Sequence, residues 1–173
     1  HGEVVLAGDA DTGAGARRAG QKGRISTAPS MPAIDVDDAL VADTKVLPDY
    51  VFQRGEPAEE LIRAPRQVTG EFRIGGQEHF YLEGQVALAV PQEDRDILVY
   101  SSTQHPSEVQ HLIAVMLGVQ SNAVTVEVRR MGGAFGGKET QAALPAAVAA
   151  LAASPLGRPS KICLSRDADM ILT

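Results

Sequence analysis

The sequence predicts an α+β fold in which strands and helices alternate through βαβ crossovers. A short strand over 97–101 comes before an amphipathic helix over 106–117. An alternating strand over 124–129, an apolar helix over 139–153 and a further strand over 161–164 follow in order. Strands separated by helices of this length are typical of parallel strands, because a crossover helix carries the chain back to the end of the sheet where the first strand began.

The composition is that of an ordinary globular domain. The 173 residues are 44% hydrophobic and 22% charged. The net charge of −6 argues against nucleic acid and against an anionic membrane as partners. No apolar run approaches the roughly 20 residues that a bilayer requires. We therefore expect no nucleic acid and no membrane among the partners.

The chain has one cysteine, Cys163, which excludes an internal disulfide and a cysteine-based zinc site. It lies in the apolar run 162–164, where we expect it to be buried as a small hydrophobic residue. A reducing, cytoplasmic compartment fits this composition.

The first third of the chain has less periodicity than the rest. Residues 1–30 predict a short strand, a turn and a helical stretch, and residues 31–66 predict an extended linker with a short helix near 35–40. Regularity begins in 67–173, where strands are expected over 68–74 and 81–90. Both ends of the chain are apolar, which predicts that it is the interior of a longer protein.

The helix over 106–117 has the strongest local signals. Pro106 suits the first helical position, and Gly118 suits a left-handed C-terminal cap. The apolar residues recur at the spacing of one buried helix face, and they are Val109, Leu112, Ile113, Met116 and Leu117.

The next two elements are also predicted from their apolar residues. Val124, Val126 and Val128 alternate with polar residues, which predicts a strand with one covered face. The helix over 139–153 is apolar on nearly all sides and should be buried, and Pro145 should kink it or delay its regular start.

The segment between that strand and that helix is the most informative. Residues 132–139 read Gly-Gly-Ala-Phe-Gly-Gly-Lys-Glu, and such a loop brings backbone N–H groups close to an anionic or electron-rich ligand. The alternative is a tight turn that packs Phe135 into the core. The segment also matches a phosphate-binding G-x-x-x-x-G-K pattern, but Glu139 stands where a nucleotide site needs Ser or Thr.

A second stretch, 75–83, gathers an amide, two acids, a histidine and two aromatic residues after a glycine turn. Each of these residues has an ordinary structural explanation when taken singly. The helical spacing of a two-histidine metal site is absent from it.

Four segments together resemble the molybdenum-binding subunit of the xanthine oxidase and aldehyde oxidase family of molybdenum hydroxylases. They are 75–83 (GGQEHFYLE), 102–106 (STQHP), 129–139 (RRMGGAFGGKE) and 165–170 (SRDADM), in the family's order and spacing. The resemblance implies that 1–30 is the C-terminal tail of a hammerhead domain, 31–66 a linker and 67–173 the N-terminal part of a molybdopterin-binding domain. Position 134 departs from the pattern, with Ala where relatives often have Gly.

The resemblance also implies roles for particular residues. Gln77 would hydrogen-bond an oxygen ligand of molybdenum, and Gly133, Phe135 and Gly136 would present backbone N–H groups to the oxo ligand and the pterin, so that Gln77 and Phe135 lie near the metal. Glu139 would hold a purine substrate. A side-chain amide donates to an oxo group without adding charge, and a carboxyl group can bond ring nitrogens.

The implied reaction is the hydroxylation of hypoxanthine or xanthine by a xanthine dehydrogenase. Electrons would pass through 2Fe-2S clusters and FAD, held by a partner subunit or domain of a hetero-oligomer, to NAD. The family's general-base glutamate would lie beyond residue 173, so these residues alone should be inactive. The alternatives are an aldehyde oxidase, in which the position of Glu139 is usually apolar, and a fragment with only a structural role.

Overall fold

The fold is described from a computed structural model, which places residues 12–24, 26, 28, 32, 34–45 and 47–173. The expected strand at 4–7 lies outside these residues. The chain divides into two units, one within Arg24–Gly76 and the other made of 12–23 and Gln77–Thr173. Within the described residues, no helix has both the length and the apolar character needed to cross a membrane.

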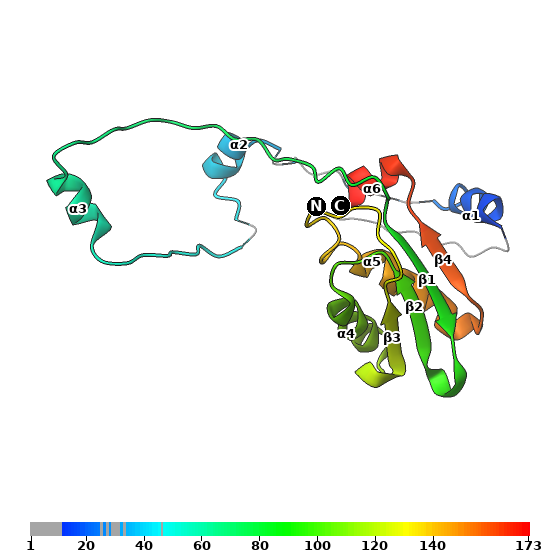
Figure 1. Cartoon of the computed structure of the whole chain (residues 1–173). Helices are drawn as coiled ribbons and strands as arrows, with labels where there is room; N and C mark the ends of the chain where they lie inside the picture. Colours follow the sequence, from blue (N-terminus) through cyan, green and yellow to red (C-terminus); the bar gives the residue numbers. More distant parts are fainter. Residues whose placement is uncertain (1–11, 25, 27, 29–31, 33, 46) are drawn as a thin grey trace. The chain divides into compact units, whose positions relative to one another are not determined.

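A four-stranded mixed sheet forms the centre of the second unit (Figure 1). Its strands are β1 (Val86–Pro91), β2 (Ile97–Ser101), β3 (Val124–Glu127) and β4 (Ser160–Cys163), in the spatial order β3-β2-β1-β4. β1 pairs antiparallel with both β2 and β4, whereas β2 and β3 are parallel. The mixed α and β architecture with crossovers confirms the predicted fold class.

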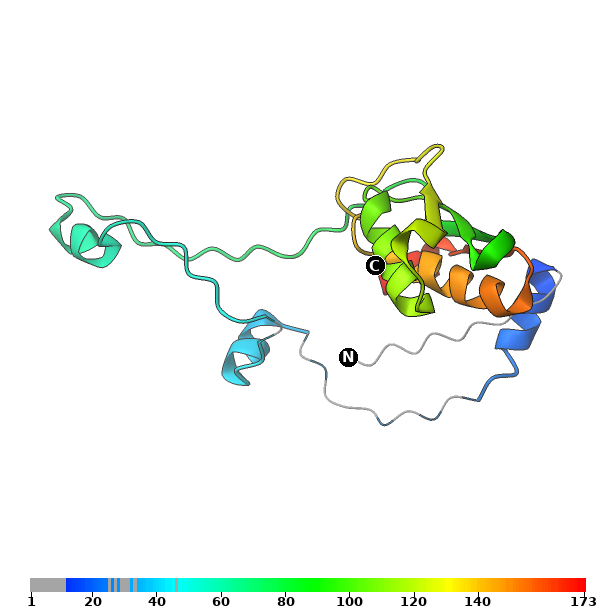
Figure 2. The ribbon, with the colours of Figure 1, turned by 90° about the horizontal axis from the view of Figure 1, so that it is seen from below.

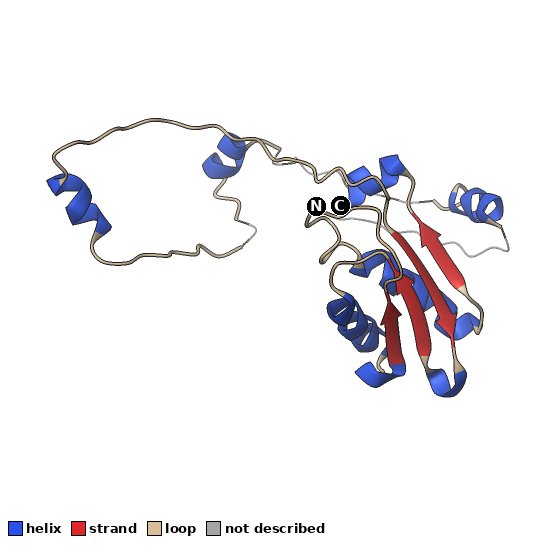
Figure 3. Ribbon diagram, in the orientation of Figure 1, coloured by secondary structure: helices blue, strands red, loops and turns tan. Residues whose placement is uncertain are grey.

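Two helices make the crossovers and lie on the same side of the sheet (Figures 2 and 3). α4 (Pro106–Leu117) connects β2 to β3, and α5 (Ala143–Leu156) connects β3 to β4 at the opposite edge. Two short 3₁₀ turns, Glu93–Arg95 and Ser121–Ala123, precede β2 and β3.

The core lies between the sheet and these helices. Ala87, Ala89, Ile97 and Val99 point toward the helices and are almost fully buried. α5 places four fully buried alanines against this face (Ala146, Ala149, Ala150 and Ala153). Small side chains on both surfaces allow helix and sheet to approach closely, and their burial supplies the main favourable term of folding.

α4 was predicted correctly in its bounds, with Pro106 in the first turn and Gly118 left-handed at φ 65°. Its buried face is narrower than predicted. Val109 and Ile113 are fully buried, whereas Leu112 and Met116 are 40% and 38% exposed. The neighbouring core residue is Ala114, so the buried face is turned slightly away from the predicted stripe.

α5 begins four residues later than predicted, at Ala143 rather than Glu139. This start puts Pro145 in the first turn, where no intrahelical N–H is required. The helix is not buried on all sides, because Leu144, Leu151 and Leu156 are each at least 39% exposed.

Two predicted strands differ from the structure. Residues 68–74 form extended chain with no strand partner, and Val68 and Phe72 are 98% and 87% exposed. The strand predicted over 81–90 begins only at Val86. Residues 81–85 lie outside the paired strands, and the side chains of Tyr81 and Gln85 make the polar contacts described below.

The C-terminal region holds a helix that periodicity did not reveal. α6 (Arg166–Leu172) has Ser165 as its N-cap, with the hydroxyl accepting the Ala168 N–H. Serine followed by acidic residues is a helix-start signal that the sequence did contain. Cys163 is exposed, contrary to the prediction, because side chains alternate along β4 and Ile162 takes the core-facing position.

The first unit contains two short helices, α2 (Val36–Val41) and α3 (Pro57–Arg63), in otherwise irregular chain. Asp35 caps α2 by accepting the Asp37 N–H, as expected near 35–40, whereas α3 was not predicted. Neither helix has a buried residue. Helix α1 (Gly13–Gly20), which belongs to the second unit, covers the helical stretch predicted within 1–30.

Candidate functional site

The glycine loop, residues 131–138, leaves the sheet after β3 and leads toward α5. Its backbone enters the left-handed region at Gly133, Phe135 and Gly136, with φ of 89°, 54° and 98°. A phenylalanine in this region costs roughly 1–2 kcal/mol, so the surrounding contacts must impose it. The Phe135 side chain is 76% exposed, which excludes the alternative that it packs into the core.

Three successive N–H groups in this loop have no hydrogen-bond partner among the residues that the structure describes. They belong to Gly133, Ala134 and Phe135. The flanking N–H groups are used inside the protein, since Gly132 donates to Glu83 and Gly136 to Gln104. The unpaired donors are therefore confined to the part of the loop where Phe135 turns outward.

Lys138 ends the loop with a side chain that is 0% exposed. Its ammonium donates to Glu83 Oε2 at 3.0 Å and to Ser102 Oγ at 2.8 Å, and it lies 4.7 Å from the centre of the Tyr81 ring. An ammonium bonded in this way is not available for a phosphate. The structure thus argues against the nucleotide site that the G-x-x-x-x-G-K pattern suggests.

Glu83 accepts hydrogen bonds from both ends of the glycine loop. Its Oε2 accepts hydrogen bonds from Ser102 Oγ, from the Gly132 N–H at 3.0 Å and from Lys138. Partial burial by itself would raise the pKa of this carboxyl, but the hydrogen bonds from Ser102, Gly132 and Lys138 outweigh it and lower the pKa. Glu83 is therefore a carboxylate at neutral pH.

The segment after β2, residues 102–104, also bonds the backbone carbonyl and N–H of Lys138. Thr103 Oγ1 donates to the Lys138 carbonyl at 3.1 Å, and the Gln104 N–H donates to the same oxygen at 2.8 Å. Gln104 Oε1 in turn accepts the N–H groups of Gly136 and Lys138 at 3.0 and 3.2 Å. Three consecutive residues, 102–104, thus bond the ammonium, the carbonyl and the N–H of one lysine.

The stretch at 77–83 packs against the same loop, so the two stretches that the sequence singled out come together. A Cβ on Gly137 would lie 2.5 Å from Tyr81 Cε1 and 3.0 Å from His79 Cγ. A Cβ on Gly136 would lie 3.4 Å from His79 Nε2. Glycine at 137 is therefore required by close approach of two segments.

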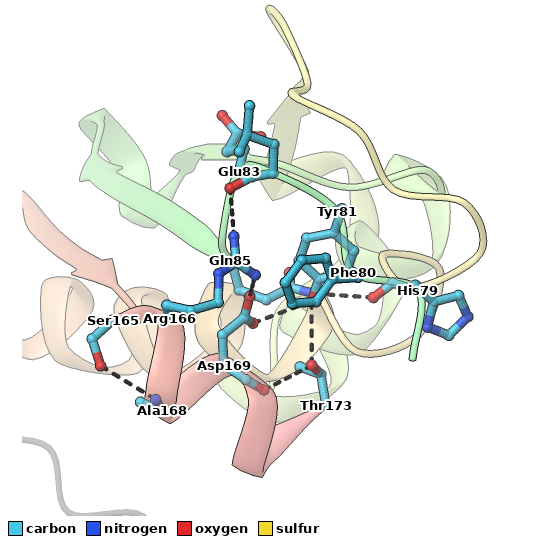
Figure 4. Close-up of polar contacts among 12 residues, drawn as sticks. His79, Phe80, Tyr81, Glu83, Gln85, Ser165, Arg166, Ala168, Asp169 and Thr173 are labelled. Atoms are coloured by element: carbon cyan, nitrogen blue, oxygen red, sulfur yellow. Dashed lines mark hydrogen bonds and ion pairs between the residues drawn. The ribbon is translucent and has the colours of Figure 1, made fainter. Parts of the chain in front are cut away.

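Tyr81 connects this stretch to α6 (Figure 4). Its hydroxyl donates to Asp169 Oδ1 at 3.2 Å, accepts from Gln85 Nε2 at 3.1 Å and lies 3.2 Å from Thr173 Oγ1. Gln85 also donates to the Gly137 carbonyl, which returns the network to the glycine loop. Asp169 and Gln85 are buried, so this network fixes the glycine loop from the interior of the protein, through the Gly137 carbonyl.

The residues with predicted site roles fall into two groups. Gly133, Phe135 and Gly136 share the glycine loop, and Glu139 follows Lys138 directly. Gln77 is exposed and lies two residues before His79, at the start of the stretch that packs on the loop. Within the described chain, neither Gln77 nor Glu139 has a hydrogen bond or ion pair to its side chain.

Sequence reasoning missed the residues whose side chains hold the glycine loop by hydrogen bonds, namely Glu83, Ser102, Gln104 and Lys138. Part of the signal was present, because the resembling segments contain all four. Nothing local indicated that the lysine is buried or that Glu83 is its partner.

The comparison with known families gives the class of protein. The chain belongs to the family described as the molybdopterin cofactor-binding domain, whose sequence model matches residues 42–173. This confirms the family to which the resemblance pointed.

Individual relatives agree with this assignment. Xanthine dehydrogenase/oxidase of Felis catus is 41% identical over 99% of this chain, and aldehyde oxidase 4 of Cavia porcellus is 39% identical over the same share. The chain spans 13% of the length of each of these relatives.

Two solved structures share the fold. The aldehyde oxidoreductase from Desulfovibrio gigas matches 90% of this chain and 18% of its own, with a TM-score of 0.74 and 24% identity. Quinoline 2-oxidoreductase from Pseudomonas putida 86 matches 92% of this chain and 21% of its own, with a TM-score of 0.71 and 24% identity.

Proposed function

We propose that this chain supplies part of the molybdenum site of a xanthine dehydrogenase that hydroxylates hypoxanthine or xanthine. The observation that carries the proposal is the exposed turn of the glycine loop. Three unpaired backbone donors at 133–135 lie four to six residues before an unpaired carboxylate, Glu139. Donors for an electron-rich group and an acceptor for a polar ring are thereby placed on one short segment.

The chemistry of the donors fits the implied cofactor. Backbone N–H groups fixed by the surrounding structure stabilise negative charge without reorganising, which suits an oxygen on molybdenum. Gln77 and Phe135 are the residues that we place near the metal, through the Gln77 amide and the Phe135 N–H. Molybdopterin, when bound, supplies the redox chemistry that removes electrons from the substrate carbon.

The glycines serve this loop in different ways. The Gly133 N–H is free to donate to the cofactor, and its φ of 89° supports the turn. The Gly136 N–H already donates to Gln104, so Gly136 contributes its φ of 98° rather than a donor. We therefore expect cofactor contacts from Gly133 and Phe135, with Gly136 setting the path of the chain.

Glu139 is the residue that we assign to substrate. It is exposed, whereas the residue before it is anchored by five hydrogen bonds to 102–104 and Glu83. A free carboxyl group on a fixed backbone can accept a hydrogen bond from a purine ring N–H. This favours purine over aldehyde, because a simple aldehyde offers no ring N–H to bond.

The rest of the enzyme also belongs to this proposal. The iron–sulfur clusters and FAD would be held by a partner subunit or domain, in a cytoplasmic hetero-oligomer that passes electrons to NAD. We retain the division into a hammerhead tail at 1–30, a linker at 31–66 and the start of the molybdopterin domain at 67–173 as a prediction. What supports these statements is the similarity to xanthine dehydrogenase relatives.

Aldehyde oxidation is the second candidate, because aldehyde oxidases match almost as well as xanthine dehydrogenases. The test is the turnover of hypoxanthine against that of benzaldehyde by the complete enzyme and by its Glu139→Ala variant. We expect a strong preference for hypoxanthine, and a loss of most purine turnover in the variant with aldehyde turnover spared. A preference for benzaldehyde, or equal losses on both substrates, would overturn the substrate assignment.

A further inference from the structure

Gln104 lies between two elements of the core. β2 ends at Ser101, and α4 begins at Pro106. Thr103, the preceding residue, is 2% exposed and its hydroxyl accepts the His105 N–H at 3.0 Å. The backbone of Gln104 is thus held firmly, although the residue itself is exposed.

The side chain of Gln104 reaches the glycine loop and makes two bonds with one atom. Oε1 accepts the N–H of Gly136 at 3.0 Å and the N–H of Lys138 at 3.2 Å. Both neighbours are donors, so the oxygen and not the NH₂ group must face them. The residue between them, Gly137, donates its own N–H to the Ala134 carbonyl at 2.8 Å.

These bonds close the turn directly after Phe135. Phe135 adopts φ 54° at a cost in free energy, and Gly136 follows it at φ 98°. A strained residue persists when neighbouring contacts determine its conformation. The bonds from Gln104 begin one residue beyond Phe135, and no other side chain among the described residues accepts the N–H groups of Gly136 and Lys138.

We propose that Gln104 is a positioning residue for the glycine loop. Its amide oxygen holds the turn in which Phe135 is exposed, next to the unpaired N–H groups of 133–135. It acts through the loop and touches no reacting group. The consequence for catalysis rests on the function proposed above, whereas the effect on loop conformation does not.

The test uses the complete enzyme with three substitutions at this position. Gln104→Met removes the acceptor at nearly unchanged length, Gln104→Asn keeps the amide but shortens its reach, and Gln104→Glu keeps an oxygen at the same reach. Gln92→Met is the matched control, because the Gln92 side chain bonds only nearby backbone carbonyls, those of Val90 and Pro91.

The primary measurement is amide hydrogen exchange in peptides that cover residues 132–142. We expect exchange about tenfold faster in the Met and Asn variants, since two N–H groups lose their partner. We expect the Glu variant and the Gln92 control to exchange as the unmodified enzyme does. Unchanged exchange in the Met variant, or equally fast exchange in the Glu variant, overturns the proposal.

Molybdenum content and kcat on hypoxanthine separate this proposal from the proposed function. Faster exchange together with lower metal content or kcat, both restored by Gln104→Glu, supports both. Faster exchange with unchanged metal content and kcat supports the positioning of the loop and overturns the loop's assigned role at the cofactor.

Discussion

Replacing Lys138 by methionine removes a buried ammonium while keeping an unbranched side chain of similar length. In the native protein this ammonium is 0% exposed and donates to Glu83 at 3.0 Å and to Ser102 at 2.8 Å. The Tyr81 ring lies against it at 4.7 Å. The substitution leaves Glu83 charged beside an apolar chain.

The cost of Lys138→Met follows from these contacts. Removing one partner of a buried ion pair typically destabilises a protein by about 3–5 kcal/mol. Glu83 is 38% exposed and retains the hydrogen bonds from Ser102 and Gly132, so the lower end applies. We expect the free energy of unfolding to fall by about 3 kcal/mol.

The assay is urea unfolding at pH 7, followed by circular dichroism, for Lys138→Met, Glu83→Gln and the double variant. Neutralising Glu83 removes the unpaired charge, so the double variant should lose about 1–2 kcal/mol less than the sum of the two single losses. Lys161→Met is the control, because Lys161 is an exposed lysine on β4, and its effect should stay within about 0.5 kcal/mol. Strictly additive losses, or a Lys138→Met variant as stable as the control, would refute the coupling of Lys138 to Glu83.

Three other predictions concern the same region. The pKa of Glu83 is lower in the folded protein than its ordinary value of 4.5. The stabilising contribution of Glu83 is therefore full above pH 4.5 and is lost as the pH falls through the folded pKa. In urea unfolding between pH 7 and pH 3, the difference in stability between the native protein and Glu83→Gln should shrink as the pH falls. Gly137→Ala should destabilise by about 1–3 kcal/mol, because the new methyl group would lie 2.5 Å from Tyr81, whereas Gly75→Ala meets no atom within 4 Å and should be neutral in the same unfolding assay. Gln77→Ala in the complete enzyme should lower kcat on purine and aldehyde alike without changing thermal stability, because its exposed amide bonds no described residue.

Each of these has a result that contradicts it. A Glu83→Gln difference that grows toward pH 3 would mean that the folded pKa is raised. Equal stability of the Gly137 and Gly75 variants would show that the loop can move away from Tyr81. A loss confined to one substrate in Gln77→Ala would place that amide at the substrate rather than near the metal.

Local patterns predicted the elements that depend on local causes. The helix at 106–117 and the strand at 97–101 were predicted with their observed bounds, because capping residues and side-chain periodicity act within a few positions. The start of α5 was predicted wrongly, at Glu139 instead of Ala143, because it depends on the path of the preceding loop and not on local residue types. Residues 139–142 (Glu-Thr-Gln-Ala) contain nothing that forbids a helix, but the chain there forms bends and turns that continue the glycine loop.

The order of segments along the chain was sufficient to recognise the family, and one of those segments, 129–139, contains the glycine loop. The strand expected at 68–74 is absent and the one expected at 81–90 begins only at Val86, because a strand requires a partner, and an apolar segment by itself does not show whether one is present. Tyr81 illustrates this, since its hydroxyl bonds Asp169, which is 88 residues away.

The sequence by itself determined the mixed α and β architecture, the crossover helices and the glycine-rich loop between β3 and α5, because each depends on residue type and short spacing. Only the tertiary structure decided that Phe135 points outward and that Lys138 is buried. The partners that make this possible, Glu83 and Ser102, lie 55 and 36 residues away from the lysine. Burial of a charge is a property of the neighbours that folding brings to it, and no local pattern carries that information.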